Sequence, residues 1–258
     1  MSKEVNGKRF RVPLLGGMGA EMRHSYEPWM LKALSEVSEH TTGCFVDVGV
    51  NLGQTLLAVK SIRSDWEYVG FEPNPLCVFY VRRFIAANKI AGCTVYPFGI
   101  GEETGAVDLH VSSETGGEAS IVSGFRPDEE YRERIKVPIM GKESLPGELM
   151  ERSVGVVKVD VEGGELDVFR ALGAVLEKER PYVFCEVLPV YDEGTERGRF
   201  RLQRQNEVLR IFGQLGYAII RLHPDGNREK LETIEVHGEL AWTNYMFVPE
   251  GKEGLFLG

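Results

Sequence analysis

The sequence has few cysteines and no long apolar run. Four cysteines occur among 258 residues, and none forms a Cys-x-x-Cys pair. This pattern argues against a disulfide framework and against a structural zinc site, so we expect buried free thiols in a cytoplasmic protein. No run of about 18 apolar residues is present, and no membrane span is expected. Pro13 and three glycines interrupt the apolar stretch 12–20, so a signal peptide is not expected either.

The sequence also lacks an excess of basic residues. Lysine and arginine total 30 against 39 aspartates and glutamates, a formal net charge of −9. This balance argues against nucleic acid as the main partner, and a small molecule is the expected one. A chain of this length buries about three quarters of its surface on folding, enough for one sizeable core. We therefore expect one large domain, residues 41–250, after an N-terminal lead-in and helix, residues 1–40. The oligomeric state is left open.

Short apolar runs alternate with stretches of helical periodicity along most of the chain. The runs expected to form the main sheet are Cys44–Val48, Tyr68–Phe71, Cys93–Phe98, Val154–Val161, Tyr182–Leu188, Tyr217–Leu222 and Trp242–Val248. The expected helices are Tyr26–His40, Gln54–Ile62, Leu76–Asn88, Glu165–Glu177 and Leu202–Leu215. Residues 1–23 read as a flexible lead-in, and 112–134 as an irregular stretch between strands Ala106–Val111 and Ile135–Ile139.

Alternating strands and helices indicate an α/β fold of the Rossmann-like, doubly wound kind. Such a fold has a mostly parallel sheet covered by helices on both faces. The carboxyl ends of its strands lie along one edge, and ligands bind there. The chemistry is therefore expected just after the strands.

The first such edge carries a glycine turn preceded by an acid. Asp47 comes before Gly49 and Gly53, and Asn51 lies between these glycines. A dinucleotide motif needs glycines at offsets 0, 2 and 5, and here offset 2 is Asn51 and offset 5 is Gln54. The missing glycines argue against a pyrophosphate at this turn, and the Asp47 carboxylate would repel one. An amino group or a sulfonium suits the turn better.

The second strand also ends in an acid. Glu72 lies 19 residues beyond Gly53 and is followed by Pro73 and Pro75. A carboxylate at this place can accept hydrogen bonds from both hydroxyls of a ribose. A tight turn and a solvated glutamate would be the plain structural alternative. The two signals together predict a nucleoside-type ligand.

A second acidic group follows the strong strand Val154–Val161. Asp160, Glu162 and Glu165 surround two glycines, and Glu186 near the end of another strand could reach the same cleft. A carboxylate close to an alcohol can act as general base, and Asp160, Glu162 and Glu186 are the candidate catalytic residues. Acids at a helix N-terminus also offset the helix dipole, which alone would explain Glu165. Close carboxylates can hold Mg²⁺, but no dedicated ligand set is visible and no metal is expected.

With these residues the sequence resembles the FkbM family of class I S-adenosylmethionine-dependent methyltransferases. The blocks that carry the resemblance are Asp-Val-Gly-Val-Asn-Leu-Gly (47–53), Phe-Glu-Pro-Asn-Pro (71–75), Lys-Val-Asp-Val-Glu-Gly-Gly-Glu-Leu (158–166) and Thr-Asn-Tyr-Met-Phe-Val (243–248). The likeness covers about residues 44–248. Val50 stands where the family usually has alanine. The family implies a seven-stranded sheet in which the last strand is reversed.

The resemblance also implies roles for single residues. The cofactor would be S-adenosyl-L-methionine, with Asp47 beside its amino group, Glu72 on its ribose hydroxyls and Asp160 near its transferable methyl. The remaining implied cofactor-binding residues lie in the turns after the first three strands of the family sheet and are Gly49, Val50, Asn51, Gly53, Pro73, Gly99 and Ile100.

The implied activity is O-methylation of a hydroxyl on a small molecule such as a sugar or natural product. Two alternatives stay open at this point: a nucleotide-dependent oxidoreductase and a non-catalytic cofactor-binding module. The acceptor cannot be named, because acceptor pockets are built from variable loops. Here those loops are the lead-in and residues 112–134, in which Ser120, Ser123 and Arg126 are candidates for substrate contact.

Overall fold

The computed structural model describes residues 1–20, 22, 27–111, 119–122 and 133–257. Its main sheet has eight strands in the order β13-β12-β14-β11-β10-β3-β4-β5. Their bounds are β3 (Cys44–Val48), β4 (Tyr68–Phe71), β5 (Cys93–Tyr96), β10 (Val154–Val159), β11 (Tyr182–Glu186), β12 (Tyr217–Leu222), β13 (Arg228–Leu231) and β14 (Asn244–Pro249). All seven expected strands are present, and β13 adds an edge strand.

The pairing explains why ligand-binding residues converge at one edge. Strands β5, β4, β3, β10 and β11 are parallel neighbours. Strand β14 is antiparallel to both β11 and β12. The reversal expected of the last family strand is therefore confirmed, and the carboxyl ends of β3, β4, β10 and β11 lie side by side.

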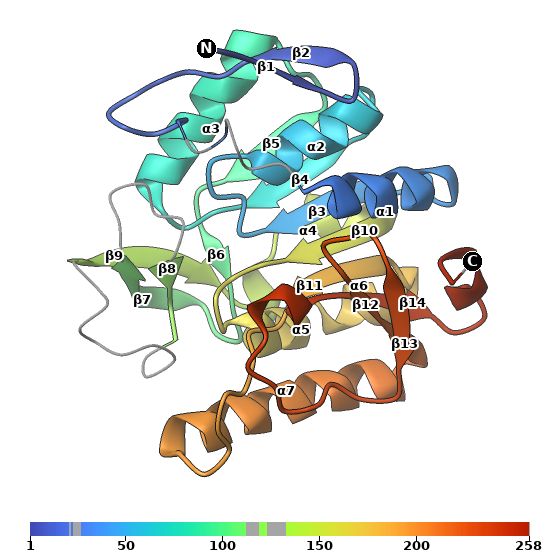
Figure 1. The fold of residues 1–258 in the computed structure, drawn as a ribbon. Coiled ribbons are helices and arrows are strands. Elements are labelled where there is room, and N and C mark those ends of the chain that lie inside the picture. The colour runs from blue at the N-terminus through green and yellow to red at the C-terminus, as the bar shows by residue number, and fades with distance from the viewer. Residues whose placement is uncertain (21, 23–26, 112–118, 123–132, 258) are drawn as a thin grey trace.

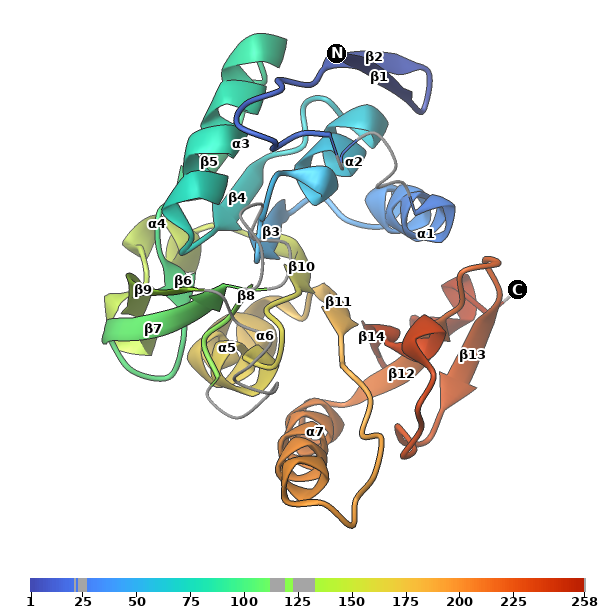
Figure 2. The same ribbon diagram turned by 60° about the vertical axis from the view of Figure 1, so that its left-hand side comes forward.

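Helices cover both faces of the sheet, as Figures 1 and 2 show. One face carries α1 (Pro28–Glu39), α2 (Gln54–Ile62) and α3 (Pro75–Asn88), which pack on one apolar cluster of the sheet. The other carries α4 (Gly147–Glu151), α5 (Glu165–Ala171), α6 (Gly173–Glu179) and α7 (Glu196–Gln214), which pack on a second cluster. Phe45 of β3 belongs to the first cluster and Val46 to the second, because successive side chains of a strand point to opposite faces. The expected doubly wound α/β fold is confirmed.

A small second sheet stands beside the carboxyl edge of the main one. It has the order β6-β9-β7-β8. Its strands are β6 (Gly99–Ile100), β7 (Gly105–Val111), β8 (Ala119–Ser120) and β9 (Glu133–Met140). Leu109, Val111 and Val137 form its own apolar core. Because β6 follows β5 directly, this sheet brings Gly99 and Ile100 to the edge where ligands bind.

The N-terminus is more ordered than the sequence analysis expected. Strands β1 (Ser2–Val5) and β2 (Lys8–Arg11) form an antiparallel hairpin, so the expectation of a flexible lead-in is wrong for these residues. The side chain of Asn88 at the end of α3 bonds the backbone of Arg11 twice, at 2.7 and 2.8 Å. A sequence signal was available, because Asn6 and Gly7 both have positive φ and Asn-Gly is the typical two-residue hairpin turn.

Other element boundaries also shift. The helix expected from Glu165 to Glu177 is two helices, α5 and α6, which meet at Leu172. Helix α7 begins at Glu196 instead of Leu202. Strand β10 ends at Val159, β5 at Tyr96 and β11 at Glu186, each two residues before the expected end.

Short 3-10 turns complete the chain. They are η3 (Lys142–Ser144), η4 (Leu240–Trp242) and η5 (Glu253–Leu255). Trp242 was expected to begin the last strand but lies in η4. Most of the expected irregular stretch 112–134, with Ser123 and Arg126, lies outside the described residues. Within the described part of the chain, no helix has the length and apolar character needed to cross a membrane.

Candidate active site

Asp160 lies where three cavities meet, just beyond the end of β10. The central cavity, about 190 Å³, runs from Glu72 and Gly99 to Asp160 and Glu186. A second cavity of about 240 Å³, here the α1 cavity, lies between α1, α2 and Asp160. A third of about 70 Å³ lies between the start of α1 and the ends of β10 and β11. Asp160 therefore borders all three cavities.

Most of the residues expected to form the site line these cavities. Nine of them line the central cavity: Gly49, Asn51, Glu72, Pro73, Gly99, Ile100, Asp160, Glu162 and Glu186. Val50 lines the α1 cavity. Asp47 and Gly53 are absent from all three linings. The structure thus gathers candidates from the turns after β3 and β4, from β6 and from the ends of β10 and β11 at one place.

The turn after β3 is shaped by its glycines. Gly49 has φ +91°, and a Cβ built on it would lie 1.9 Å from the backbone oxygen of Asp160. No side chain fits there, so the two neighbouring strands can end in direct contact. Gly53 has φ +90° and faces Val81 of α3, with 2.9 Å between its built Cβ and a Val81 methyl. Gly53 was expected to line a ligand, but its place is in the packing of the turn.

Glu72 is held by two backbone groups. Its Oε2 accepts a hydrogen bond from the Asn51 N–H at 2.7 Å, and its Oε1 accepts one from the Asn74 N–H at 2.8 Å. Burial raises the pKa of Glu72 to about 7, although both N–H groups oppose the rise. Each carboxyl oxygen keeps a second lone pair for a ligand. The turns after β3 and β4 therefore present one fixed pair of acceptors to the central cavity.

Asp47 differs from its expected place beside the ligand. Its side chain is fully buried, and its carboxylate accepts a hydrogen bond from the Tyr68 hydroxyl. The Lys158 Nζ lies 3.7 Å from its Oδ1. Burial raises the pKa of Asp47 to about 6. Asp47 therefore lies behind the cavity, where it faces Lys158.

Lys158 connects Asp47 to the cavity. Its Nζ donates to Asp160 Oδ2 at 3.1 Å. Burial alone would lower the pKa of Lys158, but the carboxylates of Asp160 and Asp47 outweigh it and raise that pKa. The ammonium charge is therefore permanent at neutral pH. It pairs with the Asp160 carboxylate, which lines the cavity.

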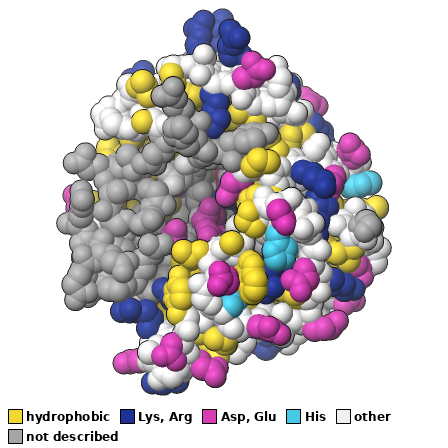
Figure 3. All heavy atoms as spheres, viewed as in Figure 1, with side chains coloured by type: hydrophobic (Ala, Val, Ile, Leu, Met, Phe, Trp, Pro, Cys, Tyr) yellow, Lys and Arg dark blue, Asp and Glu magenta, His cyan; other side chains and the backbone are white. Residues whose placement is uncertain are grey.

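Asp160, Glu162 and Glu186 form an acidic cluster. One carboxyl oxygen of each lies within 4.8 Å of the others. Burial, and then the charges of Asp160 and Glu162, raise the pKa of Glu186 to about 9. Glu186 Oε1 also accepts from the Thr243 hydroxyl at 3.1 Å. At neutral pH Glu186 therefore carries a proton, whereas Asp160 is paired with Lys158. Figure 3, viewed as Figure 1, shows acidic side chains in the middle of the molecular surface that faces the viewer.

The same cluster has the donor atoms that a divalent cation uses, and it is the one such group found among the described residues. Acidic groups of this kind are common without a metal, so the arrangement alone assigns none. Glu165 is separate from it: its Oε1 accepts from the Gly163 N–H at 2.8 Å. This contact fits the structural alternative, in which Glu165 stabilises the start of α5.

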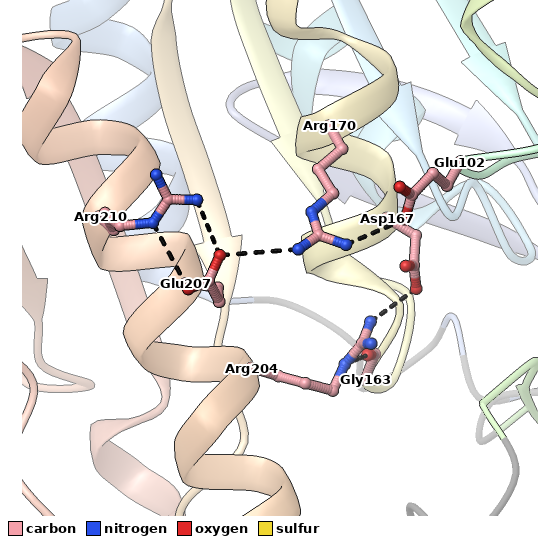
Figure 4. A network of polar contacts seen from close by, with 7 residues as sticks. All are labelled: Glu102, Gly163, Asp167, Arg170, Arg204, Glu207 and Arg210. Atoms are coloured by element: carbon pink, nitrogen blue, oxygen red, sulfur yellow. Dashed lines mark hydrogen bonds and ion pairs between the residues drawn. The ribbon is translucent and has the colours of Figure 1, made fainter.

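A network of ion pairs fixes the turn that follows Glu162 (Figure 4). Arg204 of α7 donates to the Gly163 carbonyl at 3.2 Å and to Asp167 at 2.6 Å. Arg170 of α5 pairs with Glu102 at 2.9 Å and with Glu207 of α7 at 3.6 Å. The whole network consists of Glu102, Gly163, Asp167, Arg170, Arg204, Glu207 and Arg210. Helix α7 thus fixes the turn that follows Glu162 and the start of α5 through side-chain contacts.

The sequence analysis missed the contribution of α1. Glu27, at its start, lines the α1 cavity and the small third cavity together with Lys158 and Asp160. Burial raises the pKa of Glu27, and Lys158 opposes this rise. Ser120, a candidate for substrate contact, instead donates to the backbone oxygen of Glu162 at 2.7 Å. No motif marks Glu27, because its place depends on packing between distant segments.

Comparison with known proteins decides the family. The model of a family described as "Methyltransferase FkbM domain" matches residues 47–219, more than half of the chain. The chain belongs to the FkbM methyltransferase family. Methyltransferase sdnD of Sordaria araneosa is 30% identical over 200 residues, which cover 73% of this chain and 70% of that protein. The family match makes the present chain a methyltransferase, which argues against the oxidoreductase alternative.

A solved structure agrees with the fold. A Staphylococcus aureus protein assigned as a caffeoyl-CoA O-methyltransferase has a TM-score of 0.51 at 9% identity, covering 86% of this chain and 84% of that one. The crystallised Methyltransferase FkbM of Methylobacillus flagellatus KT has a TM-score of 0.48 at 16% identity. The likeness to it covers 80% of this chain but only 43% of that longer chain.

The residues around the central cavity fit the family's cofactor, S-adenosylmethionine. Glu72 offers two fixed acceptors for the hydroxyls of a ribose. Gly99 leaves room beside Pro73, since a Cβ built on it would lie 2.6 Å from Ile139. The carboxylates of Asp160 and Glu162 suit a ligand with positive charge.

Proposed function

We propose that the protein transfers the methyl group of S-adenosylmethionine to a hydroxyl of a small molecule. The observation that carries this proposal is the position of Asp160. It lines the central cavity together with the acceptor pair of Glu72, and it lines the small third cavity with Glu186. A cofactor held by Glu72 and an acceptor entering from another side can therefore meet at Asp160.

The cofactor assignment follows the linings of the cavities. We assign the ribose hydroxyls to Glu72 and the adenine to the border formed by Pro73, Gly99 and Ile100. The methionine part is assigned to the backbone turn of Gly49, Val50 and Asn51, which faces both the central and the α1 cavities. Asp47 is not assigned a contact. The catalytic domain would comprise residues 41–250, with α1 from the preceding segment adding a wall.

The acidic cluster can accept the proton of an acceptor hydroxyl. When bound, the cofactor supplies an electrophilic methyl on a sulfonium. An alcohol attacks it weakly unless a base accepts its proton. Asp160 and Glu162 are the available carboxylates, while Glu186, which already holds a proton at neutral pH, can donate a hydrogen bond to its neighbours. We therefore assign the base to Asp160 or Glu162, and to Glu186 the positioning of the acceptor.

O-methylation, as distinct from methylation of nitrogen or carbon, is supported by the family resemblance and by this arrangement. A carboxylate base is needed for an alcohol, whose proton must leave as the new bond forms. The acidic lining also favours a neutral, hydroxylated acceptor over an anionic one. The remaining alternative, a non-catalytic cofactor-binding module, would not need three carboxyl groups beside the ligand.

Thermal unfolding with S-adenosylhomocysteine and, separately, with NAD tests the cofactor. A ligand at about 100 times its dissociation constant stabilises a protein by about 2.7 kcal/mol, which is roughly 5–10 °C in the midpoint here. We expect this shift with S-adenosylhomocysteine and none with NAD. A shift with NAD alone would contradict the proposal.

The Asp160→Asn variant tests the chemistry. We expect it to keep the S-adenosylhomocysteine shift and to lose transfer to hydroxylated small molecules, followed as release of S-adenosylhomocysteine. Transfer at the wild-type rate would remove Asp160 as the essential base. Asp225→Asn, at an exposed turn, is the matched control and should leave both readouts unchanged.

A further inference from the structure

A separate groove lies on the other side of Pro73 from the central cavity. It has a volume of about 620 Å³ and runs between α3 and β9. The two elements that border it, α3 and β9, lie at the left of the molecule in Figure 1. Pro73 lines both the groove and the central cavity. The groove, here called the α3 groove, therefore adjoins the cofactor site without being part of it.

The α3 groove is basic, although the chain as a whole carries a net charge of −9. Its described lining includes Arg82, Arg83 and Lys136 and no acidic residue. Lys136 pairs with Asp108 at 2.9 Å, outside the lining. Arg82 and Arg83 form no ion pair with any residue of the described part of the chain. The two arginines that line the groove thus leave a local positive charge that attracts an anion.

The same groove also offers apolar contact. Phe79 is 46% exposed, and the Arg83 guanidinium lies over its ring at 5.2 Å from the centroid. Prolines 73, 75, 97 and 138 supply rigid walls. Rigid walls lose little conformational entropy when a ligand binds. The volume lies in the range of small-molecule sites, about 300–1,000 Å³.

We propose that the α3 groove binds a small, soluble phosphate ester. Arg82 and Arg83 would hold the phosphate, and Phe79 with the proline walls would contact its organic part. Guanidinium groups match phosphate oxygens with paired hydrogen bonds. A phosphate monoester carries nearly two negative charges at neutral pH, which two arginines balance. The site is independent of the methyl-transfer proposal, because binding there needs no cofactor and no turnover.

Calorimetric titration of the full chain with phenyl phosphate tests the site. The titration is done with and without saturating S-adenosylhomocysteine, and inorganic phosphate and phenol are the partial probes. We expect saturable binding of phenyl phosphate, at least tenfold tighter than either partial probe. Its affinity should be unchanged by S-adenosylhomocysteine. Competition between the two would place the phosphate in the cofactor cavity and overturn the proposal.

Variants test separately the two arginines and the apolar contact of the groove. Arg82→Ala with Arg83→Ala should weaken phenyl phosphate at least tenfold. Phe79→Ala should weaken phenyl phosphate but not inorganic phosphate. The control is Arg9→Ala with Arg197→Ala, which removes the same charge at exposed positions elsewhere. An equal loss in the control would show general electrostatic attraction and contradict a built site, provided that all variants keep the wild-type unfolding midpoint.

A lipid headgroup carries the same phosphate chemistry. Sedimentation with phosphatidylcholine vesicles that contain phosphatidic acid distinguishes this source from a soluble ester. We expect no binding above that to phosphatidylcholine alone. Binding to these vesicles that depends on Arg82 and Arg83, without saturable binding of phenyl phosphate, would overturn the assignment to a small soluble ligand.

Discussion

The Lys158 Nζ lies 3.1 Å from Asp160 Oδ2 and 3.7 Å from Asp47 Oδ1. One buried cation is therefore shared between an acid in the core and an acid at the cavity. The Tyr68 hydroxyl donates a hydrogen bond to the other carboxyl oxygen of Asp47, Oδ2. The arrangement fixes the Asp160 carboxylate, and Asp47, which lines none of the three cavities, acts on the site through Lys158 and Asp160.

Replacing Lys158 by methionine should destabilise the fold by about 3–5 kcal/mol, because it leaves buried carboxylates without a counter-charge. Urea unfolding measures this loss. Adding Asp47→Asn to Lys158→Met should recover part of the loss, since one stranded carboxylate is removed. The control is Lys178→Met, whose side chain is 63% exposed and pairs with Glu179. A loss no larger than in the control would show that the buried ion pairs do not hold this region.

The buried carboxyl groups predict a stability that falls as pH rises. Asp47, Glu72 and Glu186 have pKa values raised to about 6, about 7 and about 9, respectively, with burial as the main cause of each. The folded chain therefore binds these protons more tightly than the unfolded chain does. The contribution is present below the ordinary carboxyl pKa of about 4 and is lost as pH rises through the folded values.

Urea unfolding at a series of pH values between about 5 and about 9 checks this sign. We expect the free energy of unfolding to decrease across the range. Glu186 titrates last, with its pKa of about 9, so Glu186→Gln should flatten the upper part of the profile. A wild-type stability that increases between pH 7 and pH 9 would contradict the assignment of a proton to Glu186.

Gly49→Ala tests the contact between the ends of β3 and β10. A methyl group there would collide with the Asp160 carbonyl, and a non-glycine residue at φ +91° adds about 1–2 kcal/mol of backbone strain. We expect the S-adenosylhomocysteine shift in the unfolding midpoint to disappear and the midpoint itself to fall. Gly173→Ala in α6 is the control, because its built Cβ meets nothing within 4 Å. If both variants bound S-adenosylhomocysteine equally well, the close contact between Gly49 and the Asp160 carbonyl would not be needed for the ligand site.

The sequence predicted the sheet well because its strands are continuous apolar runs between glycine turns and periodic helices. It could not predict which way Asp47 points. All five residues of β3 are buried, so the polar-apolar alternation that tells the two faces of a strand apart is missing. The family motif placed Asp47 beside the cofactor, whereas the structure turns it toward Lys158 and Tyr68.

Contacts between segments that are distant in the sequence also could not be predicted from it. Glu27 reaches the site only because α1 packs against α2, and no local pattern records that packing. The proton on Glu186 likewise follows from the burial of its side chain and then from the approach of Asp160 and Glu162 in space. The place of Glu72 in the lining of the central cavity was predictable, since an acid after the second strand needs only the strand order to reach the ligand-binding edge of the sheet.

Glu72→Gln examines the acceptor pair to which we assign the ribose of the cofactor. A glutamine amide has one acceptor oxygen, so the Asn51 and Asn74 N–H groups cannot both be satisfied as they are by the carboxylate. A lost hydrogen bond to a charged group costs about 1.5–3 kcal/mol, and we expect S-adenosylhomocysteine to bind about ten- to a hundredfold more weakly. Calorimetric titration measures the affinity. Glu67→Gln is the matched control, because its side chain is 60% exposed and pairs with Arg152 away from the cavity. Wild-type affinity in Glu72→Gln would mean that the ribose lies elsewhere, and the central cavity would then need another occupant.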